Sequence, residues 1–505
     1  IMKSYFPKQA PILIKYRNFK NFDYEVFRYK IHFDLVHKVN NRDNIDYEIF
    51  QEIFMNILND LAPQKEKLVR ANSAPYMNKT LNKAIMTRSR LKNKFNKNPD
   101  PNNEYNYKRQ RNYCVNLMRR EKKKYYSNLN INNITDNKTF WRHMKPFFSD
   151  KCISSKHITL IEGEEIVSDD IKIAEKMNDF FANTVSNLDI KGYEIPVTPD
   201  CTANEISNII AKFKDHPSVT KIKESVQVNQ SFSFSFVDEE TMTNVINNLD
   251  PRKPSTFNNI PAKFLVLTND ICSPYLRDIF NNSVTNSTFP SSLKMADISP
   301  IHKKEEKTNK ENYRPISILP SVSKIFEKIM YSQIEEYMSN YLSEYLCGFR
   351  KGYSTQYCLI LMLEKWKKEL DKRKFAGALL TDLSKAFGCL NHDLLIAKLA
   401  AYGFNSASLA FILDYPRDRK HRTKVNNRFS NWRSIISGVP EGSILGPILF
   451  NIYMNDIFLF VIEESLASYA DDSTPHTTGD DIDAVLGSLK IDTDILIEWF
   501  NNNYF

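Results

Sequence analysis

The chain has 505 residues and a net charge of +9, and its hydrophobic content of 42%, with 33 Phe and 25 Tyr, is typical of a globular protein of about three domain-sized units. Its seven cysteines show no Cys-x-x-Cys spacing, which excludes a zinc module and a disulfide framework and predicts a reducing, intracellular setting. The most apolar late stretch, residues 444–462, is interrupted by Asn451, Asn455 and Asp456, so we expect no membrane span, and we find no signal peptide pattern.

The N-terminal part is expected to hold the end of one domain and then a helical region. Residues 1–28 mix short apolar runs with Lys and Arg, which suggests the last strands of a preceding domain, and the first residue is Ile1 rather than Met, as in a fragment of a longer reading frame. Residues 29–75 are predicted to be helical, because six apolar residues recur there at the spacing of one helix face. These residues are Ile49, Phe50, Ile53, Phe54, Ile57 and Leu58.

A basic segment follows, from Lys79 to Lys124. It holds 15 Lys or Arg against three acidic residues, a net charge of +12 that exceeds the excess of the whole chain. Its pattern predicts two helices separated by a loop at residues 98–101. A phosphate backbone is one partner for such a charge, because its neutralisation releases counterions, and a solvated helix face is the alternative. The candidate nucleic-acid contacts are Arg119, Arg120, Lys122, Lys123 and Lys124.

Aromatic pairs and prolines mark the stretch between the basic segment and the C-terminal half. The pairs Phe140-Trp141 and Phe147-Phe148 could stack on bases, but aromatic residues beside amphipathic helices are more often core, and we favour core. Residues 191–235 contain three prolines and a Ser-Phe alternation, which predicts a linker. The expected divisions are a remnant of an upstream domain at 1–28, a helical basic region at 29–190, a linker at 191–235 and a C-terminal domain at 236–505.

Acidic residues near the C-terminal end are the most informative feature of the chain. Asp382 closes the apolar run from Phe375 to Thr381, which predicts a buried strand whose last residue emerges at a site. The tetrapeptide Tyr469-Ala470-Asp471-Asp472 follows about ninety residues later and is expected on a hairpin turn. Two segments that bring carboxylates together can hold divalent cations, although an Asp-Asp pair alone is as well explained by a turn or a helix cap.

The segment after Asp382 predicts a helix with clear ends. Asn391 is a capping residue, the helix should run from His392 to about Tyr402, and Gly403 stands just past its end. Further on, the glycines and the proline of residues 438–447 predict a sharply turning loop that lets the backbone approach a ligand closely. A second helix should then continue through Phe450 and Tyr453.

Six motifs in one order resemble those of reverse transcriptases, and more narrowly those of non-LTR, LINE-like retrotransposons of the Jockey type. The resemblance covers residues 236–505. The motifs are Lys303-Lys304, Asn312-Tyr313-Arg314-Pro315-Ile316-Ser317, Gly348-Phe349-Arg350, Asp382-Leu383-Ser384-Lys385-Ala386-Phe387, Gly438 to Pro447, and Tyr469-Ala470-Asp471-Asp472.

This resemblance implies an α+β fold, a right-hand polymerase with fingers and palm, preceded by the mainly helical basic region. Residues 1–28 would be the remnant of an upstream endonuclease, and the thumb would be missing because the chain stops at Phe505. The implied activity is RNA-directed DNA synthesis from a DNA primer by two-metal nucleotidyl transfer. The implied partners are template RNA, primer or target DNA and deoxynucleoside triphosphates, with no membrane partner, in a cytoplasmic ribonucleoprotein and in the nucleus; the oligomeric state is not predicted.

The resemblance also assigns roles to individual residues. Two Mg²⁺ ions, with Mn²⁺ as an alternative, would be held by Asp382, Asp471 and the carbonyl of Leu383, and Asp472 is a third acid that binds metal or orients its neighbours. The ring of Phe387 would exclude a ribose 2′-OH, although a simple core phenylalanine explains it as well. The incoming triphosphate would be gripped from the fingers and from the loop at 438–447. The residues with this role are Lys303, Lys304, Arg314, Glu441 and Gly442.

Three positions depart from the family pattern and resemble the changes of a decaying genomic copy. Position 441 is Glu where the family has Gln, position 388 is Gly where an Asp is usual, and Pro416 is expected to break a helix-like run at residues 413–422. A catalytically inactive, truncated fragment that only binds nucleic acid is therefore the alternative function. An RNA-templated RNA polymerase is disfavoured by Phe387 and by the order of the motifs.

Overall fold

The structure is a computed structural model, and it describes residues 12–39, 45–69, 76–127, 140–141, 158–183, 203–256, 259–383, 385–462 and 465–505. The chain forms two compact units. The first comprises Ile1–Tyr16 and Glu66–His157, and the second comprises Arg17–Lys65 and Ile158–Phe505. No helix among the described residues is both long enough and apolar enough to cross a membrane.

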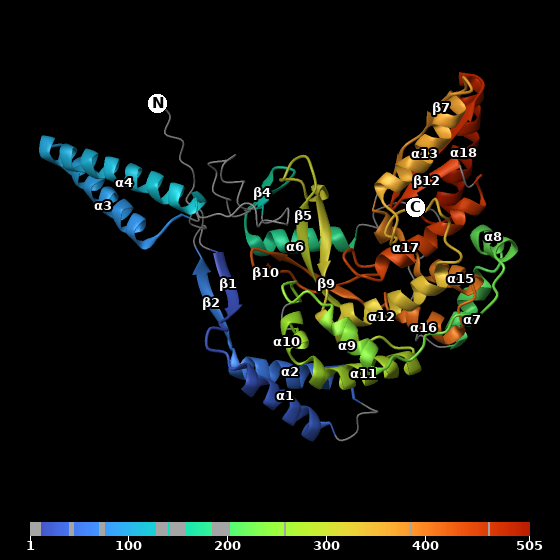
Figure 1. Cartoon of the computed structure of the whole chain (residues 1–505), viewed down its shortest axis with the longest axis horizontal. Helices are drawn as coiled ribbons and strands as arrows, with labels where there is room; N and C mark the ends of the chain where they lie inside the picture. Colours follow the sequence, from blue (N-terminus) through green and yellow to red (C-terminus); the bar gives the residue numbers. More distant parts are fainter. Residues whose placement is uncertain are drawn as a thin grey trace. The chain divides into compact units, whose positions relative to one another are not determined.

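The first unit contains a helical hairpin, α3 (Lys79–Lys97) and α4 (Pro101–Ser127), whose helices lie side by side in Figure 1. The side chain of Asn78 caps α3 by accepting the N–H of Leu81 at 2.8 Å. Four small or apolar residues form the seam of the hairpin: Leu81, Ala84, Cys114 and Leu117. The prediction of two helices around residues 98–101 is confirmed.

Two expectations about aromatic residues and strands in the N-terminal part need correction. Trp141 is 51% exposed, so its assignment to a core was wrong, whereas residues 147 and 148 lie outside the described residues. Residues 64–69, expected to be helical, form β2 (Gln64–Val69), which pairs with β1 (Ile12–Arg17). The partner strand lies about fifty residues earlier, and a local apolar period cannot reveal such pairing.

The second unit begins with α1 (Tyr24–Lys38) and α2 (Tyr47–Leu61). The periodic residues of α2 are buried, apart from the half-exposed Ile49, and pack into the main core of this unit. Residues 40–44, within the predicted helical region, lie outside the described residues.

Part of the expected linker is helical. Residues 203–225 form α7 (Ala203–Lys212) and α8 (Pro217–Ser225), and Ile206, Ile209 and Phe213 of α7 and its following turn are buried in the main core. Pro217 stands at the first position of α8, where a proline favours a helix start, so the proline marked a helix boundary rather than a linker. Residues 184–202 lie outside the described residues.

A five-stranded sheet includes the strand with Arg314 and the strand that ends just before Lys303 and Lys304. β5 (Met295–His302) pairs antiparallel with β6 (Tyr313–Ile318) and parallel with β9 (Lys420–Val425). β10 (Arg428–Phe429) and β11 (Arg433–Ser434) are antiparallel to β9. A small hairpin, β3 (Leu160–Glu162) and β4 (Glu165–Val167), and the helix α6 (Asp170–Ala182) pack against this sheet through a separate apolar cluster.

A four-stranded sheet carries the acidic residues. β12 (Leu466–Tyr469) and β13 (Asp472–Gly479) form a hairpin, and β7 (Phe375–Ala378) and β8 (Thr381–Asp382) both pair with β13. The helices α13 (Thr355–Leu370) and α18 (Ile482–Asn502) lie beside this sheet (Figure 1). The expected single buried strand is instead two short strands separated by Leu379 and Leu380, and Leu380 is 81% exposed.

The remaining helices of the second unit build the main core. They are α9 (Glu239–Asn247), α10 (Ala262–Leu267), α11 (Asn269–Asn286), α12 (Ser321–Met338), α14 (Ala386–Cys389), α15 (His392–Ala401), α16 (Ser406–Asp414) and α17 (Gly446–Asn455), with single 3-10 turns at Ser291–Lys294, Lys310–Asn312 and Asp456–Leu459. The predicted limits of α15 are confirmed, because Asn391 accepts the N–H of Leu394 at 2.9 Å and Gly403 has a φ of +92°.

The expected helix-like run at residues 413–422 is wrong. α16 ends at Asp414, the next residues form a turn that contains Pro416, and β9 starts at Lys420. Alternate residues of β9 are buried, which is the period of a strand rather than of a helix. Pro416 therefore follows a helix end, a position that prolines commonly occupy, and breaks no helix.

Candidate active site

The two acid-bearing segments are paired with each other in the four-stranded sheet. β8 runs antiparallel to β13, and Asp382 is the register partner of Asp472. In the neighbouring pair, the hydroxyl of Thr381 donates a hydrogen bond of 2.6 Å to the carbonyl of Ser473. The structure describes Asp382 through its backbone, so the distance between the carboxylates of Asp382 and Asp471 stays a prediction. So does the role of the Leu383 carbonyl; Ser384, beside it, lies outside the described residues.

The predicted hairpin turn at residues 469–472 is confirmed. Tyr469 and Asp472 are register partners, and Ala470, with a φ of +60°, and Asp471 form the turn between them. Gly348 lies directly against this turn, since a Cβ at residue 348 would stand 2.2 Å from the backbone nitrogen of Ala470. Glycine is therefore required at position 348 for the turn to keep its place.

The segment around Gly348 is bonded to the same sheet and to α17. The amide of Cys347 donates to the carbonyl of Ser468 at 2.9 Å, and the side chain of Asn451 donates to the carbonyl of Gly348 at 2.8 Å. Arg350 donates to the carbonyls of Ser343 and Leu346. This arginine thus stabilises its own loop, and the motif at 348–350 supports the acidic turn.

Phe387 lies between two other rings. It stacks on Phe450 of α17, with ring centroids 4.7 Å apart and planes at 22°, and meets Phe349 edge to face at 5.7 Å. The ring is half-buried, so one part of it packs and another part is accessible. Both of the roles that the sequence suggested, core residue and sugar-facing ring, are compatible with this position.

The loop at 438–447 is held by backbone bonds to two segments that also carry motifs. The amide of Val439 donates to the carbonyl of Phe387 at 3.1 Å, and the carbonyl of Glu441 accepts from the amide of Ser317, in β6, at 2.8 Å. Gly438 has a φ of +74°, and a Cβ there would stand 2.5 Å from the carbonyl oxygen of Phe387. The loop therefore links the segment after Asp382 to the strand that carries Arg314.

Glu327 anchors this loop and was missed by the sequence reasoning. It is completely buried on α12, accepts the amide of Ile444 at 2.7 Å and accepts the hydroxyl of Ser323 at 2.8 Å. A carboxylate within the apolar face of α12, between Phe326 and Ile329, was the available signal, because an ionised group is buried only where partners satisfy it.

Glu441, Arg314 and Asp471 share one electrostatic neighbourhood. Burial raises the pKa of the half-buried Glu441 carboxyl, the charge of Asp471 raises this pKa further, and the charge of Arg314 opposes the shift. Arg314 itself is exposed on β6. Arg314 and Asp471, from two other segments of the chain, thus both lie within electrostatic range of the Glu441 carboxyl.

Lys303 and Lys304 are exposed in the loop 303–312, between β5 and β6. The amide of Lys303 donates to the carbonyl of Asn312 at 2.8 Å, and the ammonium of Lys304 lies 3.9 Å from the mostly exposed carboxylate of Glu305. In the β5–β6 register Ile301 is opposite Arg314. The three predicted cationic groups therefore lie at the same end of one β-hairpin.

Carboxylate oxygens are suitable donors for Mg²⁺, and the pairing of β8 with β13 brings two acid-bearing segments together. Among the side chains that the structure describes, which do not include that of Asp382, no group of three or more His, Cys, Asp or Glu is arranged to hold a metal ion. The acidic residues of β8, β13 and the turn before β13 nevertheless offer the type of oxygen donor that a hard divalent cation such as Mg²⁺ prefers.

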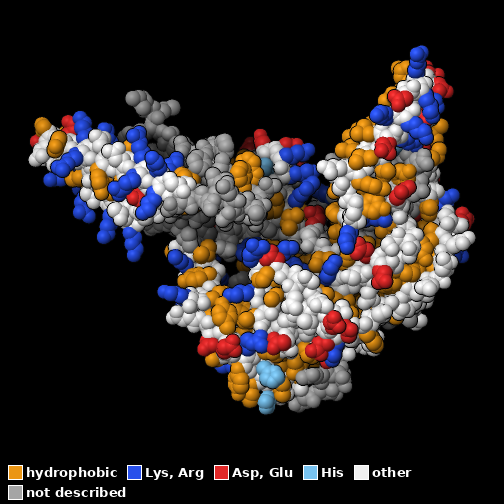
Figure 2. All heavy atoms as spheres, in the orientation of Figure 1, with side chains coloured by type: hydrophobic (Ala, Val, Ile, Leu, Met, Phe, Trp, Pro, Cys, Tyr) orange, Lys and Arg blue, Asp and Glu red, His pale blue; other side chains and the backbone are white. Residues whose placement is uncertain are grey.

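In the first unit, the surface of the α3–α4 hairpin carries many Lys and Arg side chains (Figure 2). Of the candidate nucleic-acid contacts, Arg119, Arg120, Lys123 and Lys124 are exposed. Lys122 is half-buried, with its ammonium 6.0 Å from the ring centre of Tyr76. Four of these five cations are therefore open to solvent, whereas Lys122 lies beside an aromatic residue that packs on the seam between α3 and α4.

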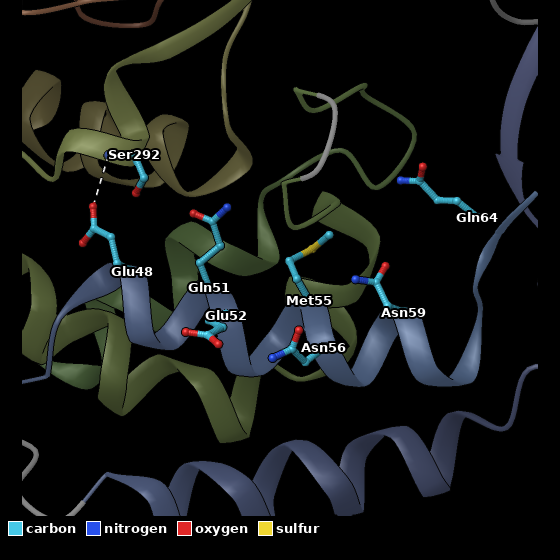
Figure 3. Close-up of a pocket in the computed structure, with 8 residues that line it drawn as sticks. All are labelled: Glu48, Gln51, Glu52, Met55, Asn56, Asn59, Gln64 and Ser292. Carbon is cyan, nitrogen blue, oxygen red and sulfur yellow. Dashed lines mark hydrogen bonds between the residues drawn. The ribbon is translucent and has the colours of Figure 1, made fainter.

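The second unit has a separate pocket of about 560 Å³ along α2 (Figure 3). Glu48 borders it and accepts the amide of Ser292 at 3.2 Å. Its lining consists mainly of amide and acidic side chains and includes none of the predicted site residues. The residues that line it are Glu48, Gln51, Glu52, Met55, Asn56, Asn59, Gln64 and Ser292.

Comparison with known proteins identifies the C-terminal part of the chain. Residues 301–504 match the family described as "Reverse transcriptase (RNA-dependent DNA polymerase)". These residues are a reverse transcriptase domain. The domain includes the five-stranded sheet from the end of β5, the four-stranded sheet and every residue predicted to act in catalysis or to bind nucleotide.

Relatives of the reverse transcriptase domain include proteins of mobile elements from fruit flies. The chain is 31% identical over 208 residues to the probable RNA-directed DNA polymerase from transposon BS of Drosophila melanogaster, which is 39% of this chain and 23% of the relative. It is 27% identical over 282 residues to the RNA-directed DNA polymerase from mobile element jockey of the same species, 54% of this chain and 31% of the relative. The resemblance to Jockey-type reverse transcriptases is confirmed, and the matched region spans less than a third of either relative.

Proposed function

We propose that this chain acts as an RNA-directed DNA polymerase of a non-LTR retrotransposon, copying an RNA template from a DNA primer. The observation that carries the proposal is the register of β8 and β13, which sets Asp382 opposite Asp472 and next to the turn that holds Asp471. The backbone bond between Ser317 and Glu441 supports the proposal as well, because it joins the loop at 438–447 to the strand that carries Arg314. The family of residues 301–504 supports the same activity.

In this proposal Asp382, Asp471, Asp472 and the carbonyl of Leu383 hold two Mg²⁺ ions. Such ions neutralise charge on the attacking and leaving oxygens of nucleotidyl transfer. The chain itself contributes position: Lys303, Lys304 and Arg314 orient the triphosphate from the β5–β6 hairpin, and Arg314 offers a bidentate fork where the lysines offer point charges. The backbone of the loop at 438–447, around Glu441 and Gly442, approaches the nucleotide, and Phe387 excludes a 2′-OH.

The parts of a right-hand polymerase are assigned on the same basis. The five-stranded sheet with the loop 303–312 would be the fingers, and the four-stranded sheet with Asp382 and Asp471 would be the palm. The basic hairpin α3–α4 would bind the phosphate backbone of template RNA or target DNA. Action in a cytoplasmic ribonucleoprotein and in the nucleus follows from the proposed template and target.

Primer extension on an RNA template tests the function. With the purified chain, Mg²⁺ and deoxynucleotides, we expect synthesis that Asp382→Asn or Asp471→Asn reduces by more than ~100-fold, because the loss of a metal ligand removes the charge that stabilises the transferred phosphate. Circular dichroism should show that both variants remain folded. Normal Mg²⁺-dependent extension by either variant would contradict the assignment of these ligands.

Absence of extension by the unsubstituted chain would favour the alternative of an inactive protein that binds nucleic acid. In that case RNA binding by the α3–α4 hairpin should persist, and restoration of Glu441→Gln and Gly388→Asp together should decide whether substitutions at the site cause the inactivity. If restored chains still extend no primer, the polymerase proposal for this chain fails.

A further inference from the structure

A segment ahead of the reverse transcriptase domain packs on the loop that carries Lys303 and Lys304. Leu160 and Val167 of the β3–β4 hairpin and Ile173, Ala174 and Met177 of α6 form one apolar cluster with Tyr313 of β6 and Val425 of β9. The amide of Ile161 donates to the carbonyl of Thr308, in the loop, at 2.9 Å. The hairpin therefore contacts both the sheet and the loop 303–312.

Glu162 links this segment to the loop by charge. One carboxylate oxygen accepts from Lys310, in the loop, at 2.6 Å, and the other accepts from Lys176, in α6, at 2.5 Å. The two lysines hold the pKa of the Glu162 carboxyl below its usual value. The side chains of all three residues are only about a third exposed, so the bridge is partly shielded from solvent.

Side-chain bonds also fix α6 to the strands beside it. The buried Asn178 accepts the hydroxyl of Thr423 at 3.0 Å and donates to the carbonyl of Asn431 at 2.9 Å. Asp179 accepts from Arg433 at 2.7 Å. These bonds fix α6 to β9 and to residues 431–433. Glu162 therefore connects the loop 303–312 to a helix that is itself bonded to the five-stranded sheet.

The ring of Phe180, on α6, is contacted by one lysine from the loop 303–312 and by one lysine shortly after Asp382. The ammonium of Lys310 lies 5.7 Å from the centre of this ring, and that of Lys385 lies 4.6 Å from it. Lys310, in the loop 303–312, and Lys385, shortly after Asp382, therefore share one contact residue on α6.

We propose that Glu162 is a positioning residue of the polymerase site, which holds the loop 303–312, with Lys303 and Lys304, at a fixed distance from Lys385 through Lys310 and α6. Glu162 touches no substrate in this role. It orders the loop before the nucleotide arrives, so that less conformational freedom is lost when the triphosphate binds. This inference rests on the proposed function for its effect on nucleotide use.

The test compares Glu162→Gln with Glu165→Gln in the full chain. Glu165, on the same hairpin, lies 3.7 Å from Lys176 and is mostly exposed, so its substitution removes the same charge from the hairpin and spares the bridge to Lys310. In Glu162→Gln we expect amide hydrogen exchange within residues 303–312 to accelerate about tenfold. The KM for deoxynucleotides should rise about fivefold, while kcat and the affinity for primer-template change less than about twofold.

Lys310→Met and the double variant complete a thermodynamic cycle. If the bridge carries the effect, the double variant should be no worse than either single variant, and Glu165→Gln should leave exchange and KM unchanged. Unchanged exchange in Glu162→Gln would overturn the proposal, and so would a lower KM, which would mean that the freed Lys310 binds the nucleotide. An unaltered KM despite faster exchange in an active enzyme would overturn it as well. If neither the unsubstituted chain nor the chain restored at positions 441 and 388 extends a primer, the proposed function fails, and hydrogen exchange alone decides whether Glu162 holds the loop.

Discussion

At the scale of single residues, Glu441 places an anion where the family pattern has a neutral amide. Its carboxyl is within electrostatic range of Asp471 and Arg314, and its carbonyl accepts from the amide of Ser317. The backbone bond does not depend on the identity of the side chain. Replacement of the carboxylate should therefore change electrostatics at the site and leave the loop at 438–447 in place.

We expect Glu441→Gln to lower the KM for deoxynucleotides about fivefold, because an anion a few ångströms from a triphosphate costs on the order of 1 kcal/mol even when well screened. The gain should shrink as the pH is lowered, since protonation neutralises a carboxyl whose pKa burial has raised. Primer extension at several deoxynucleotide concentrations measures the effect. Glu364→Gln, an exposed change of equal charge on α13, is the control, and an equal gain from it would show that net charge is responsible.

A second residue-scale prediction concerns the buried pair of Lys398 and Asp456, whose side chains have no exposed surface. The ammonium of Lys398 donates to Asp456 at 2.5 Å and to the carbonyl of Tyr453 at 2.7 Å, and the indole of Trp499 donates to the second carboxylate oxygen at 2.8 Å. Burial lowers the pKa of the Lys398 ammonium, and the charge of Asp456 and the hydrogen bond with it raise this pKa in part.

Removal of one member of this pair should leave the other charge buried without a counter-charge. We therefore expect Asp456→Asn to lower the free energy of unfolding by about 3–5 kcal/mol, and urea denaturation measures it. Asp34→Asn breaks the partly exposed pair with Lys38 on α1 and should cost less than about 1 kcal/mol. Similar losses for both variants would contradict the special weight of the buried pair.

At the scale of elements, the α3–α4 hairpin joins a thin apolar seam to a densely basic exterior. A helix pair of this composition gains little from its own burial, and its cations repel one another. Binding of phosphate offsets that repulsion and releases counterions. The proposed nucleic-acid role and the alternative of a solvated helix face therefore differ in how strongly RNA affinity depends on salt.

We expect that replacement of Arg119, Arg120, Lys122, Lys123 and Lys124 by Gln reduces the dependence of RNA affinity on salt, with the slope of log K against log[salt] falling by up to about three units. Filter binding at several salt concentrations measures the slope. Replacement of Lys367, Lys368 and Lys372, at the end of α13, by Gln is the control for net charge. An unchanged slope in the α4 variant would contradict nucleic-acid binding by these residues and would favour the alternative, a solvated helix face.

At the scale of the whole molecule, three buried histidines link the folded state to pH. Burial lowers the pKa of His392, His421 and His476 to about 4. His392 makes a 2.7 Å bond with the carbonyl of Gly438, and His476 accepts from the indole of Trp366 at 3.2 Å. They lie in different parts of the second unit, so acid should weaken this unit broadly.

Because the folded pKa lies below the unfolded value of about 6.5, the unfolded chain binds more protons below neutrality, and stability is lost as the pH falls from 6.5 through 4. At pH 5 each histidine should cost roughly 2 kcal/mol relative to pH 7.5. Urea denaturation at both pH values measures the loss. His476→Phe should reduce the difference, whereas His32→Asn, an exposed change on α1, should not. A stability that does not change between these pH values would contradict burial of neutral histidines.

The sequence by itself determined the features that depend on local signals. The two basic helices, the cap at Asn391, the turn at residues 469–472 and the helix through Phe450 and Tyr453 follow from charge, capping residues and turn chemistry within a few positions. The order of the motifs also indicated the family of residues 301–504, and the site residues that it implies stay a prediction.

Tertiary structure alone decided the features that depend on distant partners. The break between β7 and β8 follows from pairing with β13, about ninety residues away, and the burial of Ile206 and Phe213 in the expected linker follows from the main core. Glu327 and Glu162 became visible only when their partners, the amide of Ile444 and the ammonium of Lys310, were placed beside them. A carboxylate's role depends on which donors surround it, and no local pattern of sequence encodes donors that lie more than a hundred residues away.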